Sequence, residues 1–214
     1  MRFNVLDRVF GQTVDHDHAK IFLPVLFCII LTSSTFFFFD YRTIYIMGVK
    51  IHLSMGLIFF PVTFTLVNII QDLYGRRFAN TAVRYGFLSD AIFVAIAYLL
   101  SHIGERSDYL SVYEQLPTIM GMTFLFVWIS NMLNTWIFEK LKVAQCFVFI
   151  RYFISAFVAE TVISGISIPL MMRENNLNEG AVVSVLFIAT YKMTITVLLS
   201  ALVAVRMRMN IHRP

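Results

Sequence analysis

Residues 60–80 read FPVTFTLVNIIQDLYGRRFAN, an apolar run that ends in a short basic stretch. The run predicts a membrane helix, and YGRR predicts its exit into a polar environment. Three polar side chains interrupt it, at Asn68, Gln71 and Asp72. Spacings of three and four residues place such side chains on one side of a helix. The stretch therefore predicts a spanning helix with a polar face near its basic end.

The composition extends this prediction to the whole chain. Of 214 residues, 58% are hydrophobic, 14% are charged and 22 are Phe. A helix that spans a bilayer needs about 20 mainly apolar residues. Six such runs occupy residues 21–39, 53–74, 85–102, 118–138, 147–171 and 181–205. We predict an all-α integral membrane protein with six transmembrane helices in one bundle and no separate soluble domain.

Lysines and arginines predict the orientation. Under six spans, one side of the membrane carries Arg2, Arg8, Lys20, Arg76, Arg77, Arg84, Lys140, Lys142, Arg151, Arg206, Arg208 and Arg213. The other side carries only Arg42, Lys50, Arg106 and Arg173. The positive-inside rule puts both termini in the cytoplasm. We expect the membrane to be a bacterial-type cytoplasmic (inner) membrane. We predict a cytoplasmic segment at 1–20, a transmembrane domain at 21–205, a basic cytoplasmic tail at 206–214, and a cytoplasmic turn at YGRRFANTAVR, residues 74–84.

Two opposite charges are predicted near mid-membrane. Helix rise places Glu160 about 18 Å, and Lys192 about 20 Å, from the cytoplasmic ends of their spans. Both depths are near the centre of a core of about 30 Å, so the two charges can neutralise each other, and the sequence leaves open whether they form a pair. Asp72 is predicted near the interface as a partner of Arg76, four residues on.

Amide side chains and one tryptophan lie at shallower positions. Asn68 and Asn134 are about 8–10 Å from the cytoplasmic edge, and Asn131 is one turn deeper than Asn134. Trp128, three residues before Asn131, is placed to stack on a flat ring. Asp90 is predicted either to pair with Arg84 or Arg77 or to bind a ligand.

The spans thus contain polar groups that have two interpretations. One is a structural ion pair or an Asn-rich packing seam. The other is a polar cavity for a polar solute, which we favour because nearly every span contributes a polar residue.

Catalytic and metal chemistry have little support. The sequence DHDH at 15–18 lies in a short tail without further ligands, so we expect no metal site and no cofactor. HExxH, GxSxG, a Walker loop and a CxxC pair are all missing, so we do not expect an enzyme. The net charge of +4 is explained by membrane orientation, and nucleic acid is not an expected partner.

The motifs resemble those of the vitamin uptake transporter family, also called the queuosine precursor transporter family. Phe60-Pro61, Tyr74-Gly75 and Arg76-Arg77 match its signature, with Asn68 and Asp72 where the family usually has acids. TSS at 32–34, SNMLNTWIFEKLK at 130–142, RYFISAFVAET at 151–161 and YK at 191–192 resemble its other motifs. Among these, Arg151, Ser155 and Lys192 match, Asn134 replaces an Asp and Glu160 stands at a Gln position.

This resemblance implies a fold similar to the substrate-binding components of energy-coupling-factor transporters. It implies uptake of queuine or other 7-deazaguanines, which present N–H donors beside a carbonyl acceptor. The residues predicted to bind the solute are Asn68, Trp128, Asn131, Asn134, Ser155, Glu160 and Lys192. Asp72, Asp90 and Arg151 are predicted to serve coupling or structure.

Other functions remain open on the sequence. The solute is alternatively another nucleobase-like compound or a vitamin, and the chain is alternatively a subunit that needs an ATPase partner, a membrane enzyme or an assembly subunit. The expected partners are a small-molecule substrate and the lipid bilayer, with a homo-oligomer left open.

Overall fold

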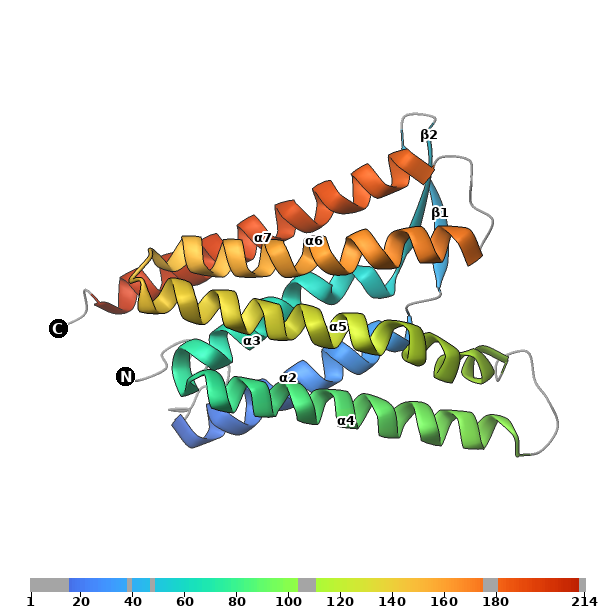
Figure 1. Ribbon diagram of the computed structural model, residues 1–214, viewed down its shortest axis with the longest axis horizontal. Helices are drawn as coiled ribbons and strands as arrows, with labels where there is room; N and C mark the ends of the chain where they lie inside the picture. Colours follow the sequence, from blue (N-terminus) through green and yellow to red (C-terminus); the bar gives the residue numbers. More distant parts are fainter. Residues whose placement is uncertain (1–15, 38–39, 47–48, 104–110, 175–180, 212–214) are drawn as a thin grey trace.

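The computed structural model describes residues 16–37, 40–46, 49–103, 111–174 and 181–211. Figure 1 shows long helices lying side by side, with a β-hairpin at one end of the bundle. The elements are α2 (His16–Phe36), β1 (Tyr41–Ile46), β2 (Val49–Ser54), the 3-10 helix η1 (Gly56–Phe59), α3 (Phe60–Tyr74), α4 (Arg76–Ser101), α5 (Ser111–Val143), α6 (Val148–Glu174) and α7 (Ala181–Ile211). Most of the predicted N-terminal segment, the end of the tail and Asp15 of the DHDH sequence lie outside the described residues.

Helix α3 is the centre of the bundle. It contacts α2, α4, α5, α6 and α7. Ten of its 15 residues are buried, including apolar residues and the amides Asn68 and Gln71. A helix that is buried on all sides needs partners for its polar groups, so the helices around α3 position any site built on it.

The hairpin departs from the predicted all-α fold. Strands β1 and β2 pair antiparallel, with Tyr41 opposite Ser54 and Ile46 opposite Val49. Residues 53–59, predicted as the beginning of the second span, form the end of β2, a bend at Met55 and η1 instead. The cause is the alternating, β-branched pattern of YRTIYI and VKIHLS, which favours strands in a segment predicted mainly as a loop.

The turn after α3 is much shorter than predicted. Gly75 alone separates α3 from α4, because helix resumes at Arg76. Its φ of 83° is a conformation that a residue without Cβ adopts at little cost, and its N–H donates to the Gln71 carbonyl at 2.9 Å. The predicted turn at 74–84 is therefore wrong, and most of its residues form the first turns of α4.

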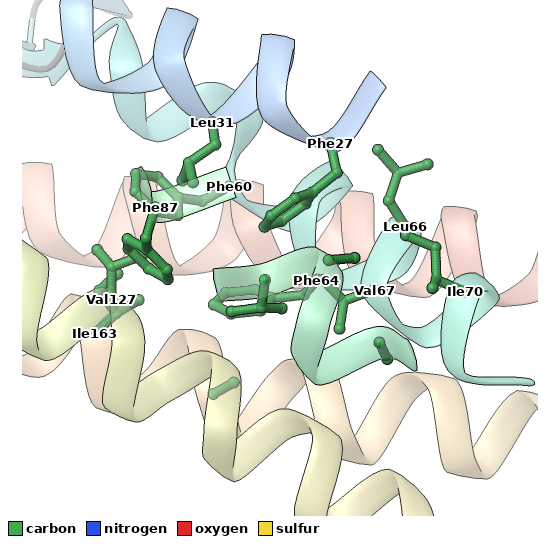
Figure 2. Packing of buried hydrophobic residues seen from close by; sticks show 14 of the residues in the cluster. Phe27, Leu31, Phe60, Phe64, Leu66, Val67, Ile70, Phe87, Val127 and Ile163 are labelled. Atoms are coloured by element: carbon green, nitrogen blue, oxygen red, sulfur yellow. The ribbon is translucent and has the colours of Figure 1, made fainter. Parts of the chain in front are cut away.

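The apolar core fills the space between α2, α3, α4 and α5. Figure 2 shows Phe64 of α3 among Phe27, Leu31 and Phe87. Phe27 and Phe64 are fully buried. Gly86 of α4 lies directly against the Phe27 ring, so these two helices pack closely at a position that has no room for a side chain.

We expect Gly86→Ala to destabilise the protein by about 1–3 kcal/mol, the usual cost of overpacking a core. The added Cβ would overlap the Phe27 ring, which is fully buried. Thermal unfolding in detergent measures the effect. Gly165→Ala is the matched control, because no neighbouring atom lies within 4 Å of the position that its Cβ would take. Equal melting temperatures for the two variants would contradict the packing described.

Among the described residues, four helices are long and apolar enough to cross a membrane, at His18–Phe36, Arg76–Ser101, Val148–Gly165 and Val183–Val205. Their apolar side chains point outward, as for Ile21, Leu99 and Leu202, which are 67%, 64% and 66% exposed. Such surfaces suit lipid better than water. Helix α3, with 15 residues, is about 22 Å long and shorter than the apolar core of a bilayer.

The helix ends divide between the two ends of the bundle. At the left of Figure 1 lie the beginning of α2, the end of α7 and the connections α3–α4 and α5–α6. The hairpin lies at the opposite end. The first and last described helices thus have their outer ends on one side, as the charge pattern requires. That this side faces the cytoplasm stays a prediction from the loop charges.

Candidate binding site

Three predicted site residues form a directional chain of hydrogen bonds, called here the polar chain. Asn134 of α5 donates through Nδ2 to Asn68 Oδ1 at 2.9 Å. Asn68 of α3 donates through Nδ2 to Ser155 Oγ of α6 at 2.9 Å, and Ser155 donates to the Arg151 carbonyl at 2.7 Å. All three side chains are fully buried. The polar chain therefore ties three helices together at the centre of the bundle.

One end of the polar chain remains open. Asn134 Oδ1 is buried and has no hydrogen-bond partner, and the same is true of Asn131 Oδ1 and Ser130 Oγ on the same helix. Asn131 donates only to the Val127 carbonyl of its own helix, at 2.9 Å. Buried polar atoms without a partner are rare and need an explanation. Here they are three oxygens on one buried face of α5, an arrangement suited to accept hydrogen bonds.

Asp72 holds an ion cluster at the basic end of α3. Its Oδ2 lies 2.8 Å from Arg151 Nη2, and its Oδ1 lies 3.0 Å from Lys142 Nζ. Tyr152 adds a longer contact to Oδ2 at 3.4 Å. The side chain of Asp72 is only 7% exposed, so the two cations, and not water, stabilise its charge. We call Asp72, Lys142 and Arg151 the ion cluster.

The predicted partner of Asp72 is therefore wrong. Arg76 is exposed and begins α4, because the turn at Gly75 ends the helix that carries Asp72 before the spacing of four residues applies. Instead, the carboxylate points toward α5 and α6. Gln71 adds to the contact between α3 and α5, because its Nε2 donates to the Thr135 carbonyl at 3.0 Å and to Glu139 Oε2 at 2.8 Å.

The two deeper charges, Glu160 and Lys192, are brought together differently from the prediction. Thr196 donates to Glu160 Oε1 at 2.6 Å, and Lys192 donates to Ser164 Oγ at 2.8 Å. No salt bridge within 4.0 Å joins Glu160 to Lys192 in the described residues. Both side chains are buried, at 4% and 2% exposure. The two charges are therefore close enough to interact, but each one makes its hydrogen bond to a hydroxyl group and not to the other.

The antiparallel register explains this correction. Moving four residues along α6, from Glu160 to Ser164, corresponds to moving four residues back along α7, from Thr196 to Lys192. Lys192 therefore lies one helical turn away from the level of Glu160. The depth estimate counted residues from predicted span ends, and α7 extends beyond its predicted end to Ile211. Thr196 shares a helix face with Lys192 at a spacing of four, a signal that would have identified it.

Asp90 and Trp128 lie outside this network. Asp90 of α4 accepts a hydrogen bond from Thr35 of α2 at 2.8 Å, whereas Arg84 and Arg77, its predicted partners, are exposed. Trp128 is 38% exposed and stacks on Phe87 with ring centres 6.3 Å apart. It lines a cavity of about 210 Å³ between α4 and α5. The structure thus separates Trp128 from the polar chain with which it was grouped.

A second cavity, of about 1070 Å³, runs between α2 and α4. Its lining is mainly apolar, with Lys20 at one end and Thr32, Ser33 and Ser89 along it. No residue of the polar chain lines either of these two cavities. In the described residues, no group of three or more His, Cys, Asp or Glu is arranged to hold a metal ion.

A helical bundle with apolar outer faces and a buried polar interior defines a multi-pass membrane protein. A family model described as "Putative vitamin uptake transporter" matches residues 54–206, well over half of the chain. The chain belongs to this vitamin uptake transporter family. Comparisons with curated proteins and with solved structures found no match.

Proposed function

We propose that the protein takes up a planar, nucleobase-like solute of the 7-deazaguanine class, such as queuine, across the cytoplasmic membrane. In this proposal the six helices α2 to α7 form one bundle within the membrane, including the short α3. The observation that carries it is the open end of the polar chain. Three buried oxygens, on Ser130, Asn131 and Asn134, lack a hydrogen-bond partner.

The chemistry of the solute complements these oxygens. A 7-deazaguanine presents ring and exocyclic N–H groups, which are donors, and an amide oxygen accepts two hydrogen bonds. Binding would remove the desolvation cost of unpartnered acceptors, about 1–3 kcal/mol for each buried group. Glu160 offers a stronger acceptor for adjacent N–H groups, because Oε2 has no hydrogen bond in the described residues.

Lys192 complements the other edge of the ring. Its ammonium group donates to Ser164 and lies 5.7 Å from the Phe60 ring centre. A carbonyl oxygen of the solute would accept from the same ammonium group, while Phe60 provides an apolar ring surface. Glu160 therefore provides a carboxylate and Lys192 an ammonium group one helical turn apart along the bundle. This arrangement suits a solute whose donor and acceptor edges are separated.

Release at the basic end requires the ion cluster to open. Asp72, Lys142 and Arg151 join α3, α5 and α6 at this end, and Asn68 of the polar chain lies one turn away on α3. In the structure these contacts close that end of the bundle. We infer that transport alternates between this closed state and one in which α3 separates from α6.

A thermal-shift screen of the purified protein tests the proposed solute. We expect queuine and the 7-cyano and 7-aminomethyl precursors to stabilise it by about 2.7 kcal/mol at 100-fold excess over Kd. That corresponds to about 5–11 °C for a chain of this size. A 7-deazaguanine methylated at N1 and dimethylated at the exocyclic amine lacks the N–H donors of that edge and should give no shift.

Variants connect the shift to the site. Asn131→Leu removes an unpartnered oxygen while breaking only a bond to the Val127 carbonyl, so it should fold and lose at least ten-fold in affinity, about 1.4 kcal/mol. Thr161→Val is the control, because its exposed hydroxyl bonds the carbonyl of Phe157 on its own helix. The proposal would be refuted if the methylated compound gave the same thermal shift as queuine. It would also be refuted if queuine gave the same shift with Asn131→Leu as with wild type.

A further inference from the structure

Asp90 is a buried carboxylate that the proposed solute site does not use. Its side chain is 4% exposed at the packing surface between α4 and α2. Oδ2 accepts a hydrogen bond from Thr35 Oγ1 at 2.8 Å. Oδ1 is buried and has no partner. Half of the carboxylate is therefore unsatisfied within a helix that is apolar enough to cross a membrane.

The described part of the chain gives Asp90 no counter-charge. No ion pair within 4.0 Å includes it. The titratable groups on its own helix are the exposed Arg76, Arg77, Arg84, Tyr85 and Tyr98. Among the side chains that the structure describes, the helices packed against α4 carry His18, Lys20 and Cys28 on α2, Asp72 and Tyr74 on α3, and Glu139, Lys140 and Lys142 on α5. The nearest cation on α2, Lys20, is 15 residues from Thr35 and so about 22 Å away along the helix.

A proton is the ligand that suits this environment. An ionised carboxylate without a counter-charge is strongly disfavoured inside a membrane, and protonation removes the charge. It also turns one oxygen into an O–H donor while Oδ2 still accepts from Thr35. A metal cation fits less well, because hard cations take six or more oxygen ligands and only Asp90 and Thr35 offer side-chain oxygens in this contact.

Asp90 lies near a cavity on one side and near the candidate site on the other. The cavity of about 1070 Å³ is lined by Ser89 of α4 and by Thr32 and Ser33 of α2, close to the Asp90–Thr35 contact. On the other side, Phe87, one turn before Asp90, packs on Phe124 and Trp128 of α5. Helix α5 carries the open end of the polar chain. A displacement of α2 from α4 would therefore expose Asp90 and act on α5 through Phe87.

We propose that Asp90 is the carboxyl group that couples solute uptake to proton entry, taking up a proton when α2 and α4 separate and burying it when they close as seen here. The proton enters from water on the outer side, resides on Asp90 and leaves to water on the cytoplasmic side, one for each cycle. This inference rests on the proposed transport function. It adds the source of free energy, and it assigns Thr35 the role of a positioning residue.

Proteoliposomes that contain the full chain test the coupling. With tritiated queuine as the probe, wild type should accumulate the compound when the outside is acidic, and a sodium gradient at equal pH should give no accumulation. Asp90→Asn keeps the shape and the acceptor for Thr35. We expect it to lose gradient-driven accumulation at least ten-fold while retaining exchange of queuine between equal concentrations. Asp90→Glu should retain part of the accumulation.

A spectroscopic measurement keeps this inference separable from the choice of solute. The infrared difference spectrum of wild type minus Asp90→Asn should contain the C=O band of a protonated carboxyl group at neutral pH. Absence of this band, or accumulation by Asp90→Asn equal to wild type, would overturn the role of Asp90. If Asp90→Asn lost both queuine exchange and accumulation, Asp90 would have a structural role, and the coupling role would also be overturned. Failure of wild type to transport queuine, with the band present, would count against the proposed solute alone.

Discussion

Glu160→Gln is expected to reduce uptake about 100-fold while leaving folded protein in the membrane. The carboxylate is buried, Thr196 occupies Oε1, and Oε2 has no hydrogen bond in the described residues. A hydrogen bond to a charged group contributes about 1.5–3 kcal/mol, or 10- to 150-fold in binding. Gln has the same shape and still accepts from Thr196, so the fold should be preserved. Uptake of labelled queuine by cells, normalised to the amount of protein in the membrane, measures the effect.

Two further variants separate the carboxylate from its surroundings. Thr196→Val removes the donor to Glu160 and keeps the charge, so uptake should fall by less than ten-fold. Glu139→Gln changes a carboxylate that accepts from Gln71 near the basic end of the bundle, and uptake should change little. Normal uptake by Glu160→Gln would remove Glu160 from the solute site.

Asp72→Asn is expected to destabilise the protein by about 3 kcal/mol and to lower Tm by about 6–12 °C. Removal of one partner from a buried ion pair leaves the other charge without compensation, which costs about 3–5 kcal/mol. The lower end applies here because Lys142 is 34% exposed and can turn to water, whereas Arg151 is 14% exposed. Size-exclusion chromatography and thermal unfolding in detergent measure this loss.

Arg76→Ala is the matched control for the ion cluster. Arg76 follows Asp72 by four residues, the spacing from which a pair was predicted, yet it is exposed on the next helix. We expect its Tm to lie within about 2 °C of wild type, because surface charges contribute little to stability. A larger loss for Arg76→Ala than for Arg151→Ala would mean that Asp72 pairs within the α3–α4 turn and not across the bundle.

Much of the helical architecture could be predicted from hydropathy, because lipid-facing helices expose apolar residues along their length. The runs at 21–39 and 181–205 correspond closely to α2 and α7. The β-hairpin at 41–54 was missed, because most of its residues lie in the loop predicted between the first two spans, to which no element was assigned. The short α3 followed from the same error, because the strand and η1 occupy the first residues of that predicted span.

Part of the group of residues predicted for the site is brought together in the structure, whereas the pairing between side chains could not be predicted. Asn68, Asn134 and Ser155 were grouped from the sequence, and the structure joins them in the polar chain. Helical spacing identifies which side chains share a face of one helix. It does not give the rotation or the axial register between helices, and these decide which side chains meet. Thr35 as the partner of Asp90 and Lys142 as a partner of Asp72 come from such contacts between helices.

The two bonds between α6 and α7 lie one helical turn apart and have the same form, a charged group bonded to a hydroxyl. Glu160 meets Thr196 and Lys192 meets Ser164, with the two contacts four residues apart on each helix. A slide of one helical turn, about 5.4 Å, is the step that would bring Lys192 level with Glu160. Such a step exchanges two charge–hydroxyl bonds for one direct ion pair. The axial register of α7 therefore determines whether the carboxylate is free for a ligand or neutralised by the protein itself.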